Sequence, residues 1–270
     1  PNVAPFLSRL LIQRLITSNP TPAYVGRVSA AFTSSGGDLK AVIRAILLDS
    51  EARDFSRLSV TSHGLVREPY TRYIAMARAL EAAPVDASAG GRFRGFSSLD
   101  SDFLQKPLSA SSVFNFYSPD NKPAGPLRDA GLNSPEMQIT NSVSSITGPN
   151  RFSTALNASA LPTNIGWTQL NPNGQTDALW NTRINEGKWL ALSTSNPAAL
   201  APDAMVATLD TLLCYGKMSQ ATFRAITRAL NRLDDPFATA DLTVRDQRIR
   251  ARLRNAIHLI TTSADYAVLK

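Results

Sequence analysis

The sequence has little of what disulfide frameworks, metal centres and membrane spans need. Its 270 residues include one cysteine, Cys214, and two histidines, His63 and His258. One cysteine excludes an internal disulfide framework and a cysteine-based zinc site, and two histidines exclude a zinc centre built on several histidines. No apolar run approaches the roughly 18 residues of a transmembrane helix. Hydrophobic residues still make up 43% of the chain, so we expect a sizeable buried core rather than a disordered chain.

Motifs of nucleophilic hydrolases are also missing. The sequence contains no G-x-S-x-G pentapeptide, which exposes a serine on a strained turn, and no S-x-x-K motif. Ser62 and His63 are neighbours, but adjacent side chains rarely point at one another, so we interpret them as part of an exposed loop. His258 and Cys214 stand among apolar residues of helical segments, which favours a role in packing for both.

The charge balance is basic, because 28 Lys and Arg against 21 Asp and Glu give a formal charge of +7. The densest basic run consists of Arg245, Arg248, Arg250, Arg252 and Arg254, with Asp241 and Asp246 in or beside it. At helical spacing these arginines point in several directions around the axis, and no interleaved aromatic residues offer a stacking platform. We therefore interpret the run as a solvated helix face and do not expect nucleic-acid binding.

Helical periodicity dominates the chain, and strand-like alternation is scarce. We expect helices over residues 5–17, 24–32, 39–48, 70–82, 131–146, 204–213, 220–233 and 244–262. Asp38, Asp203 and Ser219 are the expected N-caps of three of them. Residues 148–201 are rich in Asn, Thr, Pro and Gly, which predicts a long loop-rich insertion. The sequence thus predicts a mainly α fold, an irregular multi-helix bundle that forms a single domain over residues 1–270.

Short segments spread along the chain follow one another in the order of a known family. They are NVAPF at 2–6, LIQRL at 11–15, TSNP at 17–20, GDLKAVI at 37–43, ILLD at 46–49, EAR at 51–53, REP at 67–69, SVFNFY at 112–117, GL at 131–132, PEMQITN at 135–141, RLR at 252–254, AI at 256–257 and TSADY at 262–266. Together they resemble the C-terminal half of the DUF1800 family of bacterial proteins. The stretch 148–201 carries no such segment.

The resemblance implies a cellular location and a missing partner segment but no activity, because no function is assigned to the family. Members are usually longer, with a helical N-terminal half, and many carry export signals. We therefore expect a fragment-like chain whose partner is that missing half, and a periplasmic or extracellular location. A face meant for the missing half would also suit a homodimer.

Two glutamates in the family-like segments are the candidate catalytic residues. Glu68 and Glu136 stand near expected helix starts, where a carboxylate is stabilised by the helix dipole, so capping is the alternative role. A functional role would need both to converge in a polar pocket beside Phe114 and Phe116. The expected ligand-binding partners in that pocket are Arg67, Asn115, Gln138 and Asn141, which could hold a small polar ligand or assist a general acid and base.

Calcium is the one cofactor for which the sequence offers a candidate. Asn171, Asn173 and Asp177 place side-chain oxygens at alternating positions around Gly174. The segment departs from the EF-hand loop in spacing and lacks its terminal bidentate glutamate, so an Asx-rich turn is the alternative. Asp100 and Asp102 form a further short acidic pair.

Two functions follow from these observations. The first is a non-catalytic helical module that acts in binding or envelope assembly, as the absence of a nucleophile, metal cluster or phosphate loop suggests. The alternative is a hydrolase of small esters, lactones or glycosides with a carboxylate-based or calcium-assisted site around Glu136 or Asn171.

Overall fold

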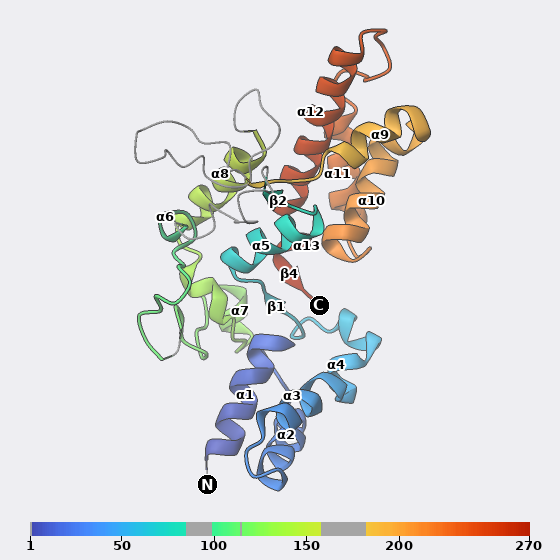
Figure 1. Ribbon diagram of the computed structural model, residues 1–270. Helices are drawn as coiled ribbons and strands as arrows, with labels where there is room; N and C mark the ends of the chain where they lie inside the picture. The colour runs from blue at the N-terminus through green and yellow to red at the C-terminus, as the bar shows by residue number, and fades with distance from the viewer. Residues whose placement is uncertain (1, 85–98, 114, 158–181) are drawn as a thin grey trace. The chain divides into compact units, whose positions relative to one another are not determined.

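The computed structural model describes residues 2–84, 99–113, 115–157 and 182–270, and it confirms a mainly helical fold (Figure 1). Contacts divide the chain into two compact units. Unit 1 comprises Pro1–Arg67, Ala110–Asn141 and Val268–Lys270, and unit 2 comprises Glu68–Ser109 and Ser142–Ala267. The single domain over residues 1–270 stays a prediction.

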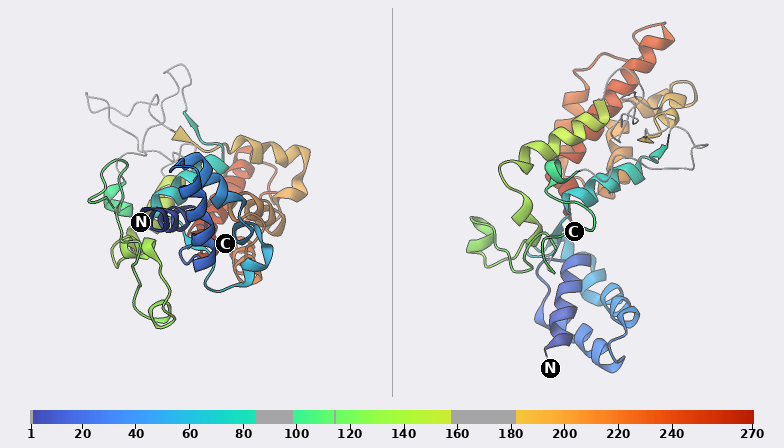
Figure 2. Two further views of the ribbon diagram at one scale, coloured as in Figure 1. Left: turned by 90° about the horizontal axis from the view of Figure 1, so that it is seen from below. Right: turned by 60° about the vertical axis from the view of Figure 1, so that its left-hand side comes forward.

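Three helices, α1 (Val3–Leu15), α2 (Pro22–Ser34) and α3 (Leu39–Leu48), form the body of unit 1, and they lie against one another in the views of Figure 2. This unit also contains α4 (Ser50–Arg53) and α7 (Pro126–Asp129), with the 3₁₀ helices η1 (Phe55–Ser59) and η3 (Pro135–Ile139). Ile12, Tyr24, Val28, Val42 and Ile46 are fully buried and form one core, because the apolar face of each helix turns toward the other two. As predicted, Asp38 caps α3 by accepting a hydrogen bond from the Lys40 amide.

The end of the chain returns to unit 1 as a strand. Strand β1 (Leu65–Val66) pairs antiparallel with β4 (Val268–Leu269). Gly64, just before β1, has a φ of +113°, and a Cβ there would lie 2.5 Å from the Leu269 carbonyl oxygen. Only glycine allows the two backbones this close approach.

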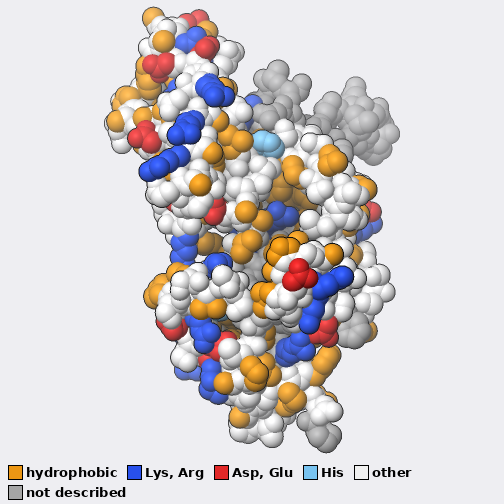
Figure 3. Space-filling view, turned by 180° about the vertical axis from the view of Figure 1, so that it is seen from behind, with side chains coloured by type: hydrophobic (Ala, Val, Ile, Leu, Met, Phe, Trp, Pro, Cys, Tyr) orange, Lys and Arg blue, Asp and Glu red, His pale blue; other side chains and the backbone are white. Residues whose placement is uncertain are grey.

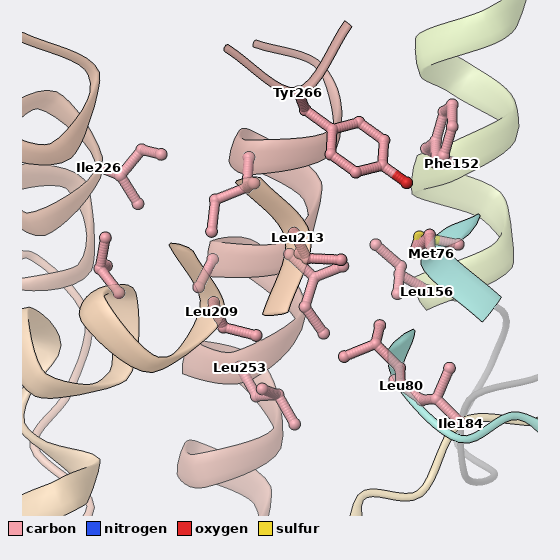
Figure 4. Packing of buried hydrophobic residues seen from close by; sticks show 14 of the residues in the cluster. Met76, Leu80, Phe152, Leu156, Ile184, Leu209, Leu213, Ile226, Leu253 and Tyr266 are labelled. Atoms are coloured by element: carbon pink, nitrogen blue, oxygen red, sulfur yellow. The ribbon is translucent and has the colours of Figure 1, made fainter. Parts of the chain in front are cut away.

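Unit 2 is a helical body with a larger core. Its helices are α5 (Pro69–Ala79), α6 (Asp100–Phe103), α8 (Ser144–Asn157), α9 (Gly187–Ser195), α10 (Pro202–Cys214), α11 (Gln220–Leu230), α12 (Leu242–Thr261), α13 (Ala264–Ala267) and the 3₁₀ helix η5 (Pro197–Leu200). A short antiparallel pair joins β2 (Ala83–Pro84) to β3 (Thr182–Arg183). Figure 4 shows Leu209 and Leu213 of α10 and Leu253 of α12 among the core side chains, with Leu80 and Leu156 opposite them.

Two expected elements differ from those observed. The helix expected over 131–146 is instead the short η3 followed by α8, which begins at Ser144 and continues through Pro149 into the expected insertion. Burial of Phe152, Ala155 and Leu156 at helical spacing stabilises α8 despite its proline. The described part of 148–201 also contains β3, α9 and η5, so it is more regular than a loop-rich insertion, and residues 158–181 lie outside the described residues.

Of the helix caps expected in unit 2, one is confirmed and one is not. Ser219 accepts a hydrogen bond from the Thr222 amide at the start of α11, as predicted. Asp203 is not the cap of α10, because Pro202 begins that helix and Asp203 lies in its first turn. None of the helices in the described ranges is long and apolar enough to cross a membrane.

Candidate functional site

Most of the predicted site residues belong to unit 1. Arg67, Asn115, Glu136, Gln138 and Asn141 lie in that unit, whereas Glu68 is the first residue of unit 2. Arg67 is buried, Asn115 has a φ of +70°, and Asn141 is exposed. Phe114 lies outside the described residues. A ligand-binding or catalytic role of these residues stays a prediction.

Glu136 is a buried carboxylate beside an arginine that the sequence analysis did not select. It lies in the first turn of η3 with 2% of its surface exposed. The Nη1 atom of Arg14 in α1 is 3.8 Å from its Oε1 atom. The same guanidinium lies over the ring of Tyr117, 4.2 Å from its centroid. The pair therefore compensates the buried charge of Glu136 and joins α1 to two distant segments.

Two glutamine side chains reinforce this connection. Gln13 Nε2 donates to the carbonyl oxygens of Ser18 at 3.0 Å and Pro119 at 3.2 Å. The Ser118 amide donates to Gln138 Oε1 at 2.6 Å. The predicted ligand-binding residue Gln138 thus holds the main chain that follows Tyr117.

The side chains of two asparagines, Asn19 and Asn121, complete the network with hydrogen bonds to the main chain. Asn19 Nδ2 donates to the Asn133 carbonyl at 2.9 Å, and the Asn133 amide donates back to Asn19 Oδ1 at 2.8 Å. Asn121 Nδ2 donates to the Ser134 carbonyl at 2.9 Å. These hydrogen bonds therefore connect residues 13–19 with residues 118–121 and 133–138 within unit 1.

His258 is half-buried in α12, as expected of a structural residue, whereas His63 is half-buried rather than part of an exposed loop. Burial, with the nearby cations Arg57 and Lys270, lowers the pKa of His63. Burial alone lowers the pKa of His258. Both imidazoles are consequently neutral at neutral pH.

The basic run on α12 is not the solvated face that the sequence predicted. Arg254 donates to both carboxylate oxygens of the buried Glu186, at 2.8 and 3.2 Å, and Arg250 bonds the same carboxylate. Arg252 is 5% exposed and donates to the Leu200 carbonyl at 3.0 Å. Arg248 donates to the Asp235 carbonyl at 2.8 Å, and Arg245 lies over the Phe237 ring. The acceptors of Arg250, Arg252 and Arg254 lie 52 to 68 residues away, which sequence spacing does not reveal.

A calcium site stays a prediction, because its candidate residues lie outside the described part of the chain. The calcium candidates Asn171, Asn173 and Asp177 lie outside the described residues. Within the described part of the chain, no group of three or more His, Cys, Asp or Glu side chains could hold a metal ion. In the acidic pair Asp100 and Asp102, the Oδ2 atom of Asp102 lies 3.9 Å from Arg151 Nε. Burial raises the pKa of the Asp102 carboxyl.

Unit 2 contains a pocket of about 280 Å³ that the sequence analysis missed. It is formed by the end of α5, by α9 and by α10, and it is lined by Ala79, Leu80, Glu81, Asn185, Lys188, Trp189, Leu192, Thr208 and Leu212. Its walls are largely apolar: Leu80 and Trp189 are 5% and 8% exposed, while Leu212 is 43% exposed. An apolar pocket with a few polar groups is the usual form of a small-molecule site.

The polar groups of the pocket form one connected set. Glu81 Oε2 accepts a hydrogen bond from Asn185 Nδ2 at 3.0 Å, and Glu81 Oε1 bonds Lys188 Nζ. Glu81 has a φ of +52°, an uncommon conformation for a residue other than glycine. The main-chain N–H of Asn185 donates to the Leu80 carbonyl at 2.9 Å, which holds the segment before α9 against the end of α5. Lys188 and Asn185 hold the pKa of the Glu81 carboxyl below its usual range.

No curated protein and no solved structure gives a significant match to the chain. The model of one family, described as a protein of unknown function (DUF1800), matches residues 1–268. Since this match spans nearly the whole sequence, the chain belongs to the DUF1800 family.

Proposed function

We propose that this protein is a helical binding module whose pocket in unit 2 takes a small apolar molecule with an oxygen acceptor at one end. The pocket carries this proposal, because it combines apolar walls with one connected set of hydrogen-bonding groups. Its volume of about 280 Å³ equals that of about nine water molecules at ~30 Å³ each. The ligand would therefore have roughly ten non-hydrogen atoms.

The hydrogen bonds at the pocket define the polar end of the ligand. An ammonium group has three N–H donors and a side-chain amide has two. Lys188 and Asn185 each spend one donor on Glu81, and both Glu81 oxygens already accept a bond. Thr208 Oγ1 donates to the Ala204 carbonyl. The polar set thus has surplus donors, which suit a carbonyl or carboxylate oxygen.

The same groups favour binding over catalysis. The described pocket lining includes no Ser, Cys or His, and the only carboxyl group in it is that of Glu81. Because Lys188 and Asn185 lower the pKa of Glu81, that group stays ionised and is a weak general base at neutral pH. Glu136, the candidate of the hydrolase alternative, has only 2% of its surface exposed, which gives a substrate little access.

The place of binding follows from the family resemblance alone. Export of related proteins supports action in the periplasm or outside the cell, in binding or envelope assembly. Fractionation of the parent bacterium with an antibody against this chain tests the location. Recovery with the periplasmic or secreted proteins supports it, and recovery with cytoplasmic proteins contradicts it.

Fluorescence of Trp189 tests the pocket directly. The double substitution Trp167→Phe and Trp180→Phe leaves Trp189 as the only tryptophan. Octanoate and octanamide present an eight-carbon body with an oxygen acceptor, whereas octylammonium presents only donors. We expect the first two to change the Trp189 emission saturably and octylammonium to have little effect.

A pair of leucine variants controls for nonspecific hydrophobic binding. Leu212→Gln changes the pocket wall and should weaken octanamide binding about tenfold, given ~1.5 kcal/mol or more for the lost apolar contact. Leu48→Gln makes the same change at a position that is 51% exposed and outside the pocket, and it should leave binding unchanged. Equal weakening in both variants, or no saturable response to any probe, would overturn the proposal.

A further inference from the structure

Helix α11 carries a row of cations that the internal contacts of unit 2 do not use. Arg224 and Arg228 lie on α11 and Arg232 follows its C-terminal end; all three are exposed and stand at four-residue spacing. At 1.5 Å rise per residue, Arg224 and Arg228 lie about 6 Å apart along one helix face. Lys217, also exposed, precedes the helix. In the view of Figure 3, several Lys and Arg side chains follow one another along the upper left of the molecule.

These four cations have no charge compensation within the described ranges of the chain, where none of them forms an ion pair. The sequence from 211 to 233 contains no Asp or Glu. The acidic residues that flank α11 have other partners: Asp234 pairs with Arg248, Asp210 accepts from the Met218 amide, and Asp265 accepts from Ser219 Oγ. The row is therefore a locally uncompensated positive surface.

The opposite face of α11 holds the helix in place. Ile226 and Leu230 are 4% and 0% exposed, and Phe223 and Leu233 pack against the same core. The helix consequently cannot turn its apolar side outward without opening the core of unit 2. Any partner must bind the basic face as it stands, by charge.

From this geometry we infer that the α11 face attaches the protein peripherally to an anionic phospholipid surface. A bilayer of anionic headgroups needs only exposed cations, each of which adds about a fivefold increase in partitioning. Tyr215, 65% exposed and two residues before Lys217, suits the headgroup level, where amphipathic rings are common.

Nucleic acid fits this face less well. A single-strand site interleaves its cations with aromatic side chains that stack on bases. The one aromatic residue of α11, Phe223, packs against the core, and the arginines of α12 are spent on internal acceptors. Four cations remain, fewer than the 6 to 10 phosphate contacts of strongly salt-dependent DNA binding.

Co-sedimentation of the full chain with vesicles tests the inference. Vesicles of phosphatidylcholine with about 30% phosphatidylglycerol should bind the protein at low salt, and vesicles of phosphatidylcholine alone should not. Salt of about 0.5 M should release it, because screening shortens the reach of the charges. Replacing Arg224, Arg228 and Arg232 together with glutamine should lower partitioning about 100-fold.

A matched triple variant separates the α11 face from net charge. Arg44, Arg53 and Arg78 are exposed and lie elsewhere in the chain. Replacing these three with glutamine removes the same charge and should lower partitioning less than about threefold, since none of them belongs to the α11 row. Circular dichroism confirms that both variants are folded.

Three results would overturn the inference. They are an equal loss in the matched triple variant, equal binding to neutral vesicles, and displacement from anionic vesicles by duplex DNA at a matched phosphate concentration. The last result would assign the face to nucleic acid.

Discussion

Two glycines of unit 1, Gly64 and Gly26, should change the free energy of unfolding in opposite directions when each is replaced by alanine. At Gly64, a φ of +113° and the Leu269 carbonyl leave no room for a Cβ. Gly64→Ala should therefore lower the free energy of unfolding by about 1 to 3 kcal/mol, measured from urea midpoints. Gly26 lies inside α2 with nothing within 4 Å of a Cβ, so Gly26→Ala should raise it by about 0.5 to 1 kcal/mol. A neutral Gly64→Ala variant would contradict the close approach of the C-terminal strand.

Because two buried tyrosines have raised pKa values, we expect the free energy of unfolding to fall at alkaline pH. Burial raises the pKa of Tyr73 in unit 2 to about 12, and burial with the Asp49 and Glu51 charges raises the pKa of Tyr24 in unit 1. Above pH ~10 the unfolded chain loses these protons while the native state keeps them, so unfolding becomes easier as the pH rises toward ~12.

The size of this effect can be read from one variant. For Tyr73 a rise of the pKa from 10.0 to about 12 corresponds to about 2 to 3 kcal/mol. Tyr73→Phe lacks this ionisation, so its urea midpoint should fall less between pH 10 and 12 than that of the wild type. Identical pH slopes in both proteins would contradict the burial of an ionisable Tyr73.

At the scale of elements, Glu186 holds the basic helix α12 against the segment before α9. Its carboxylate is 3% exposed and bonds both Arg250 and Arg254. Glu186→Gln leaves two partly buried guanidinium groups without their counter-charge, and should cost about 2 kcal/mol in a calorimetric unfolding experiment.

A second carboxylate serves as the control for this change. Glu81→Gln breaks an ion pair whose members are 51% and 65% exposed, and it should leave the unfolding midpoint close to that of the wild type. If the Glu186 variant melts like the Glu81 variant, the Arg250–Glu186–Arg254 cluster does not stabilise α12.

Local sequence signals predict the helices better than they predict the contacts between distant segments. Asp38 and Ser219 were predictable caps because a cap acts within three residues. The continuation of α8 through Pro149 was not predictable from composition, since it depends on burying Phe152 and Leu156 in a core built by other helices. The buried contacts of the α12 arginines are not predictable for the same reason, because Glu186 lies more than 60 residues from Arg254.

At the scale of the whole molecule, the candidate sites depend on pairs far apart in the sequence. The family-like segments draw attention to Glu136 and Gln138, but they do not predict the contacts of these residues with Arg14 and Ser118. The pocket joins Glu81 to Lys188, 107 residues later, in a stretch where the sequence offers no motif. Only the folded helices α5, α9 and α10 reveal that apolar walls and polar groups meet there.

Calorimetric titration of the protein with octanamide at several temperatures tests the pocket most directly. Burial of the alkyl chain against Leu80, Trp189 and Leu212 predicts saturable binding near one site per chain, with a negative heat-capacity change. Leu212→Gln should weaken the binding, and Leu48→Gln should not. Absence of saturable heat, or the same titration curve for Leu212→Gln and the wild type, would contradict the account.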